Sequence, residues 1–225
     1  MPDYKTQVYL MPGMAANPSI FDGIKLPPDH FEIHKLDWFV PDKGMTLADY
    51  AQNMSSKIEH ENPVLIGVSF GGMLVQEMAN HIKTAKVIIV SSVKKDSELP
   101  KRMLFAKYTK VHKLLPTGLV NNVELLAKYA FGETVTKRLE LYEKYLSVRD
   151  KRYIDWSIDK IVNWKQNKPL DNLVHIHGDK DAVFPIVNIK DCIPVKNGTH
   201  TMIIHRAKWF NERLPAIILG EDSSI

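Results

Sequence analysis

A serine flanked by glycines follows a run of aliphatic residues in the first third of the chain. Residues 64–72 read VLIGVSFGG, which places Ser69 at the centre of a G-x-S-x-G pentapeptide. That motif carries a nucleophilic serine when a strand precedes it and a helix follows it. Residues 64–68 are almost wholly aliphatic, and residues 72–82 carry apolar side chains at helical spacing. The stretch therefore predicts a nucleophile on a sharp strand-to-helix turn.

The two glycines have a steric reason in such a turn. A serine held there has an unfavourable backbone conformation, and side chains two residues away on either side would collide. The turn directs the hydroxyl away from the sheet and places the N–H of Phe70 at a helix N-terminus, where it can stabilise an oxyanion. A glycine-rich turn without a catalytic role is the alternative interpretation. The presence or absence of a suitable base and acid elsewhere in the sequence distinguishes the two.

A serine nucleophile needs a base and an acid that orients the base, in the chain order Ser, Asp or Glu, His. Residues 174–181 read VHIHGDKD, a predicted strand that runs into a turn with two candidate acids, Asp179 and Asp181. This segment follows a predicted parallel strand, and so does a histidine-containing segment near the C-terminus. Open α/β sheets place their sites at the carboxyl ends of such strands. The order and the placement therefore agree with a serine nucleophile.

The candidate bases lie near the C-terminus. His200 belongs to the stretch GTHT at residues 198–201, a predicted loop between a strand and the last helix. His205 lies within that helix. A loop position at the end of a strand favours His200 as the base.

A metal site is a second interpretation of the same region. His175, His177 and Asp179 fit an H-x-H-x-D spacing, and histidines two apart on a strand share one face. Lys180 stands where a further histidine would normally follow, and no other spaced cluster completes the set. We therefore expect no metal and a packing or hydrogen-bonding role for His175.

The elements around these residues alternate between strands and helices, which predicts α/β architecture with a mainly parallel sheet. Thr46, followed three residues later by Asp49, predicts a capped helix, and residues 201–214 predict the last helix. The predicted strands span residues 6–11, 31–36, 64–68, 86–91, 173–177 and 192–195.

The interval 97–168 breaks this alternation, because it is long, helical in period and rich in Tyr and Trp. A parallel crossover needs only a dozen or more residues. We therefore predict a core domain of residues 1–96 and 169–225 with a helical cap inserted at 97–168. Apolar runs at residues 123–131 and 139–146 are expected to cover the carboxyl edge of the sheet above Ser69.

Composition restricts the class of protein. The 225 residues are 44% hydrophobic and 25% charged, with a formal net charge of +4. Basic residues are densest at 94–113, where their helical spacing indicates a solvated helix face, and no partner nucleic acid is expected. The chain contains no apolar stretch long enough for a membrane span, its start does not resemble a signal peptide, and its one cysteine, Cys192, predicts a cytoplasmic protein.

These residues together resemble the α/β-hydrolase family over nearly the whole chain. Its H-G-x-x-D turn falls on Asp181, with Asp179 as the rival acid, and its G-x-H pattern falls on His200. The resemblance implies an oxyanion hole formed by the backbone N–H groups of Met14 and Phe70. Two features depart from the family: Pro12 stands where histidine is usual, and the first two antiparallel strands are missing, which leaves about six strands.

The resemblance implies a serine hydrolase that cleaves an ester or related acyl bond of a small, hydrophobic substrate through an acyl-enzyme, without a cofactor. An apolar pocket is expected around Phe21, Met73, Val183 and Phe184. A thioesterase, a lactonase, a carbon–carbon hydrolase or an acyltransferase would use the same three residues. A small-molecule receptor without catalytic activity is the alternative from a different class.

Overall fold

Six parallel strands form the centre of the molecule. The computed structural model describes residues 5–110 and 144–222, and all statements below concern these residues. The strand order is β2-β1-β3-β4-β5-β6, and every neighbouring pair is parallel. The strands are β1 (Thr6–Met11), β2 (Phe31–Lys35), β3 (Val64–Val68), β4 (Lys86–Val90), β5 (Leu173–Gly178) and β6 (Ile193–Val195). The predicted sheet of about six mainly parallel strands is confirmed.

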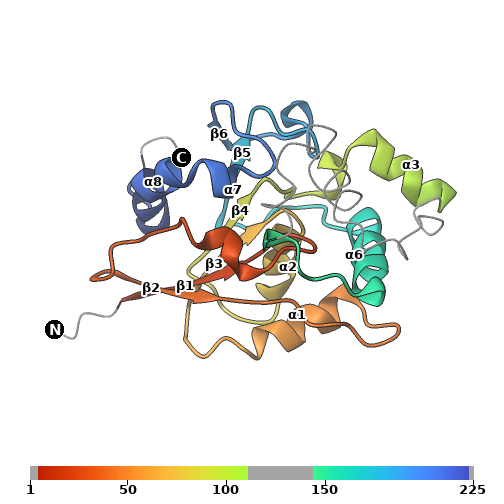
Figure 1. Ribbon diagram of the computed structural model, residues 1–225, viewed down its shortest axis with the longest axis horizontal. Coiled ribbons are helices and arrows are strands. Elements are labelled where there is room, and N and C mark those ends of the chain that lie inside the picture. Colours follow the sequence, from red (N-terminus) through yellow and green to blue (C-terminus); the bar gives the residue numbers. More distant parts are fainter. Residues whose placement is uncertain (1–4, 111–143, 223–225) are drawn as a thin grey trace.

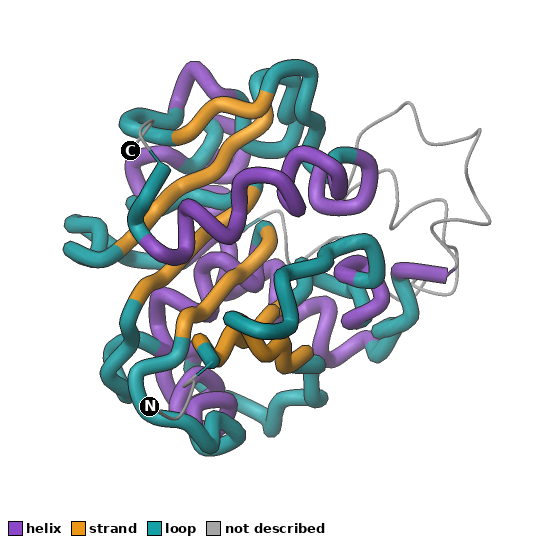
Figure 2. The backbone as a smooth tube through the Cα atoms, turned by 90° about the vertical axis from the view of Figure 1, so that its left-hand side faces the viewer, coloured by secondary structure: helices purple, strands orange, loops and turns teal. Residues whose placement is uncertain are grey.

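The strand order reverses between β1 and β3, and this sets which face each helix covers. Right-handed crossovers place α1 (Leu47–Ser55) and α2 (Phe70–Met78) on one face, because both follow moves in the same direction along the sheet. The β1–β2 connection moves the other way and lies on the opposite face with α8 (Ala207–Leu219), where Asn211 bonds to Gly23 O and accepts from the N–H of Lys25. Figure 2 shows helices on both sides of the strands. The reversal point is where open α/β sheets place ligands.

The helix α1 begins as its sequence predicts. The Thr46 hydroxyl accepts the Asp49 N–H at 3.1 Å, and the Asp49 carboxylate accepts the Thr46 N–H at 3.2 Å. This reciprocal capping satisfies two backbone donors that have no partner within the helix.

The C-terminal helix differs from the prediction of one helix over residues 201–214. It is divided into α7 (Met202–His205) and α8, with Arg206 between them at φ −117° and ψ 25°. The Arg206 guanidinium donates to Asn197 O at 3.1 Å, which fixes this break. Apolar periodicity continues across the break, so the sequence pattern alone does not reveal it.

Two helices of the 97–168 interval are described, α3 (Lys101–Thr109) and α6 (Lys151–Asn163). They contact each other, and Figure 1 shows them at the opposite end of the molecule from α8. The predicted apolar runs at 123–131 and 139–143 lie outside the described residues. Three short 3₁₀ turns complete the described structure: η1 (Pro18–Phe21), η2 (Asp96–Glu98) and η6 (Ile186–Asn188).

The basic stretch at 94–113 is not a single solvated helix face. Lys94 is buried before α3 begins, and its Nζ donates to the carbonyl oxygens of Lys190 at 2.6 Å and Asp191 at 2.9 Å. The prediction was wrong for Lys94 because these backbone acceptors come from a distant loop. Within residues 5–110 and 144–222, no helix has the length and apolar character that crossing a bilayer would require.

Candidate active site

Ser69 lies on the turn between β3 and α2 in a strained conformation. Its φ of 53° and ψ of −120° are unfavourable for a residue with a side chain. Backbone and side-chain bonds hold it there: Ser69 N donates to Val90 O at 2.9 Å, and Ser92 Oγ donates to Ser69 O at 2.7 Å. Sequence analysis missed Ser92, which no motif marks.

The glycines on either side of Ser69 are required by close backbone approaches. A Cβ at Gly67 would lie 2.3 Å from Gly71 O, and a Cβ at Gly71 would lie 2.3 Å from Pro12 O. Neither contact is possible for a larger residue. The steric reason that the sequence suggests for these glycines is confirmed, and the Gly71 contact also brings the start of α2 against the loop after β1.

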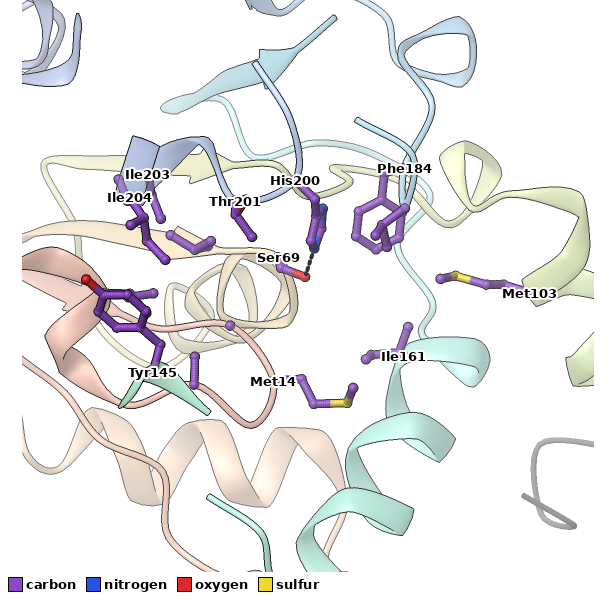
Figure 3. Close-up of a pocket in the computed structure, with 15 residues that line it drawn as sticks. Met14, Ser69, Met103, Tyr145, Ile161, Phe184, His200, Thr201, Ile203 and Ile204 are labelled. Atoms are coloured by element: carbon purple, nitrogen blue, oxygen red, sulfur yellow. Dashed lines mark hydrogen bonds between the residues drawn. The ribbon is translucent and has the colours of Figure 1, made fainter. Parts of the chain in front are cut away.

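Ser69, His200 and Asp181 form one chain of hydrogen bonds. His200 Nε2 lies 2.9 Å from Ser69 Oγ (Figure 3). His200 Nδ1 lies 2.9 Å from Asp181 Oδ2 and 3.1 Å from Oδ1. Nδ1 carries a proton when it donates to the carboxylate, so Nε2 of the neutral ring is free to accept the serine proton. This arrangement can activate a hydroxyl as a nucleophile.

Asp181 is held by its own turn after β5. Its Oδ1 accepts the N–H groups of Val183 at 2.8 Å and Phe184 at 2.9 Å. Burial raises the pKa of this carboxyl, but the charge and hydrogen bond of His200 and the N–H of Phe184 outweigh burial, so its pKa is lowered overall. Asp181 is therefore ionised at neutral pH.

The rival residues have other surroundings. Asp179 is half-buried, and its Oδ1 has no hydrogen-bond partner among the described residues. His205 lies in α7. The structure brings Asp181 and His200 to Ser69, in the arrangement that the family patterns indicate.

The loop after β1 lies beside Ser69. A Cβ at Gly13 would stand 3.4 Å from Ser69 Cβ, and Met14 lines the cavity at Ser69. In the described part of the chain, neither the Met14 N–H nor the Phe70 N–H has a hydrogen-bond acceptor. Both donors are therefore available to a ligand.

A mostly apolar cavity of ≈ 100 Å³ opens at Ser69. Val183 and Phe184 line it as predicted, whereas Phe21 and Met73 do not line it and are instead 1% and 0% exposed within the core. The cavity walls come both from the 97–168 interval and from the residues on either side of it in the sequence. The residues that sequence analysis missed include Met103, Tyr145, Ile161, Ile203 and Ile204, whose side chains surround Ser69 and His200 in Figure 3.

The two histidines of the H-x-H-x-D spacing bond to each other. His175 Nε2 lies 3.0 Å from His177 Nδ1, and His177 Nε2 lies 2.8 Å from Phe184 O. Burial lowers the pKa of both rings, which keeps them neutral. Among the described residues no group of three or more His, Cys, Asp or Glu side chains could hold a metal ion.

Comparison with known proteins identifies the architecture. No protein-family model matches the sequence, and no curated protein matches it. The structure is similar to a hydrolase from Pseudomonas aeruginosa PA01, with a TM-score of 0.73 and 15% identity over 96% of this chain and 90% of that one. It is also similar to a bromoperoxidase from Bacillus anthracis, with a TM-score of 0.72 and 15% identity over 96% and 92% of the two chains. An esterase from Exiguobacterium antarcticum gives a TM-score of 0.68 and 17% identity over 96% and 93%. The chain therefore has the α/β-hydrolase fold.

Proposed function

We propose that this protein is a serine hydrolase that cleaves an ester or related acyl bond of a small apolar substrate through an acyl-enzyme. One observation carries the proposal. A serine at φ 53° between strand and helix is 2.9 Å from a histidine nitrogen, and the other ring nitrogen is 2.9 Å from a buried carboxylate. Esterases among the solved structures of this fold support the same activity.

The reaction begins with proton transfer from Ser69. His200 Nε2 takes the hydroxyl proton as Ser69 Oγ attacks the substrate carbonyl carbon, and Asp181 stabilises the imidazolium. The carbonyl oxygen becomes an oxyanion that accepts the N–H groups of Met14 and Phe70. His200 then gives its proton to the leaving alcohol oxygen, and the carbon–oxygen bond breaks to leave the acyl group on Ser69.

Water completes the cycle. His200 Nε2 accepts a proton from a water molecule whose oxygen attacks the acyl carbon. Collapse of the second tetrahedral intermediate returns that proton to Ser69 Oγ and releases the carboxylic acid. A thioester, a lactone or an acceptor other than water would use the same steps.

The substrate-binding walls support a cap role for residues 97–168. Met103 of α3 and Ile161 of α6 line the cavity together with Ser69. We propose that this insertion is the cap and that the acyl group lies against it. We also propose a cytoplasmic location, because one cysteine cannot form an internal disulfide.

Two esters of equal chain length test the proposal. The butyryl and succinyl esters of p-nitrophenol differ by a terminal carboxylate, and the apolar walls should desolvate that charge at a cost. We expect kcat/KM for the butyryl ester to exceed that for the succinyl ester by at least about tenfold, since a lost 1.4 kcal/mol is tenfold. Ser69→Ala should abolish both reactions. A chain that binds apolar esters without hydrolysing them would be the receptor instead.

A further inference from the structure

Trp38 contacts both segments that carry the oxyanion donors. It lies in the loop after β2, is 8% exposed, and is not marked by any motif. We infer that Trp38 is a positioning residue that aligns the Met14 and Phe70 N–H groups as one oxyanion hole. The inference rests on the proposed function, because the two donors matter only if an oxyanion forms.

The first contact orients the Met14 donor. The indole Nε1–H of Trp38 donates to Gly13 O at 2.9 Å, and Ala16 N donates to the same oxygen at 3.1 Å. Gly13 O and the Met14 N–H belong to one peptide unit. In a trans peptide the two groups point in opposite directions within one plane. The hydrogen bond from Trp38 that fixes the Gly13 carbonyl oxygen therefore also fixes the Met14 N–H, which points in the opposite direction.

The second contact reaches the Phe70 donor. The Trp38 ring stacks on the Phe70 ring with a centroid distance of 5.1 Å and an angle of 5° between the planes. Phe70 is fully buried and is the first residue of α2. Because its side chain cannot move without displacing the indole, the same ring that orients one donor also fixes the residue that supplies the other.

The loop needs support from outside because its own backbone is strained. Ala15 has a φ of 63°, which a residue with a side chain rarely adopts. Pro12 offers no side-chain hydrogen bond to hold it. Tyr153 of α6 accepts the Ala15 N–H at 3.3 Å, and Tyr145 O accepts the Asn17 N–H at 2.9 Å. These bonds hold the later part of the loop, whereas the Trp38 side chain bonds the peptide of the Met14 donor itself, together with the Ala16 N–H.

Trp156 provides a matched control. It belongs to the same aromatic cluster and is 9% exposed. Its ring packs edge-on against the Phe70 ring, with a distance of 5.9 Å between the ring centroids. Its indole also donates to a backbone carbonyl, that of Met45 at 2.7 Å, but Met45 is far along the chain from the oxyanion loop. Trp38→Phe and Trp156→Phe thus remove the same group from similar surroundings, and only Trp38→Phe removes a hydrogen bond to Gly13 O.

The test compares ester hydrolysis by the wild type and both variants, with thermal unfolding to confirm that each is folded. We expect Trp38→Phe to lower kcat about 10- to 100-fold with KM within about twofold, below the ~10²–10³ that follows complete loss of an oxyanion donor. Trp156→Phe should stay within about threefold of wild type, because it leaves the hydrogen bond to Gly13 O and the stacked Trp38–Phe70 pair in place.

A transition-state analogue separates positioning from folding. A trifluoromethyl ketone forms a tetrahedral oxyanion on the serine, whereas the corresponding amide binds without one. Trp38→Phe should weaken binding of the ketone by the same factor by which it lowers kcat/KM. Its affinity for the amide should equal that of the wild type. If Trp38→Phe does not fold, incorporation of benzothienylalanine at residue 38 replaces the indole N–H with sulfur and keeps the ring.

Equal losses in the two phenylalanine variants, or weaker binding of ketone and amide alike, would overturn the inference. If the wild type hydrolyses esters at Ser69 and Trp38→Phe is as active as the wild type, the role of Trp38 is refuted and the proposed function is not. A wild type without Ser69-dependent hydrolysis would refute the proposed function itself.

Discussion

Asp179 and Asp181 lie two residues apart, and their surroundings give them different roles. Asp181 is 5% exposed, bonds to His200 and accepts two backbone N–H groups, which lowers its pKa despite its burial. Asp179 has one carboxylate oxygen without a partner in the described part of the chain. Only Asp181 can hold the tautomer of His200 that leaves Nε2 free to accept a proton.

This difference predicts unequal effects of two matched substitutions. Asp181→Asn should lower kcat on the order of 10⁴-fold, as the corresponding change does in the serine proteases that illustrate this triad. Asp179→Asn should lower kcat less than about tenfold, because no hydrogen bond among the described residues links its carboxylate to Ser69, Asp181 or His200. Steady-state kinetics on the butyryl ester measure both. A reversed order would mean that Asp179, not Asp181, orients the base.

The sequence predicts the candidate catalytic residues better than the residues that hold them in place. Ser69 and His200 could be proposed from their types, order and neighbours, and Asp181 could be preferred over Asp179 through the family resemblance. Ser92 and Trp38 could not, because each bonds to a backbone carbonyl more than twenty residues away and any donor could serve there. Pocket residues fail for a similar reason: Phe21 and Met73 have apolar character that suits a core as well as a cavity wall.

The proposed nucleophile follows the carboxyl end of β3, and the proposed acid follows that of β5. The almost wholly aliphatic sequence of β3 predicted a strand that is buried on both faces, whereas β5 alternates aliphatic residues with His175 and His177. The last helix was less predictable: α7 and α8 share one apolar period, and the break at Arg206 depends on a contact with Asn197. Close approaches between elements were visible in sequence only where glycine is required, as at Gly67 and Gly71.

The strand β5 also carries two buried histidines whose titration should affect stability. Burial, the neighbouring His177 and the charge of Lys94 lower the pKa of His175 well below 6.5, and burial lowers that of His177 although Asp181 opposes it. Below pH 6.5 the unfolded chain therefore binds more protons than the native one. Stability should then fall as the pH decreases below that value, by up to about 1.4 kcal/mol per pH unit for each histidine.

The variant His175→Gln separates this effect from general acid sensitivity. It removes one titrating ring, so the free energy of unfolding should depend on pH less steeply below 6.5 than in the wild type, by about one proton. Urea unfolding between neutral and mildly acidic pH measures the slope. Parallel curves for variant and wild type would show that His175 takes up no proton on unfolding.

At the scale of the whole molecule, the site exists only where distant parts of the chain meet. The proposed nucleophile follows β3, the proposed acid follows β5, the proposed base follows β6, and the loop that carries the proposed Met14 donor follows β1. Helices α3 and α6 of the 97–168 interval add walls to the same cavity. The sequence predicts this convergence, because parallel strands bring their carboxyl ends to one edge, but it does not predict the shape of the cavity.

Covalent labelling of Ser69 tests the central claim most directly, because it requires the strained turn, the base, the acid and the oxyanion donors together. The folded wild type should react with a fluorophosphonate to form a single adduct, located by mass spectrometry on the peptide that contains Ser69. Ser69→Ala should remain unlabelled and folded. A wild type that hydrolyses esters yet forms no adduct at Ser69, or forms one elsewhere, would contradict this account.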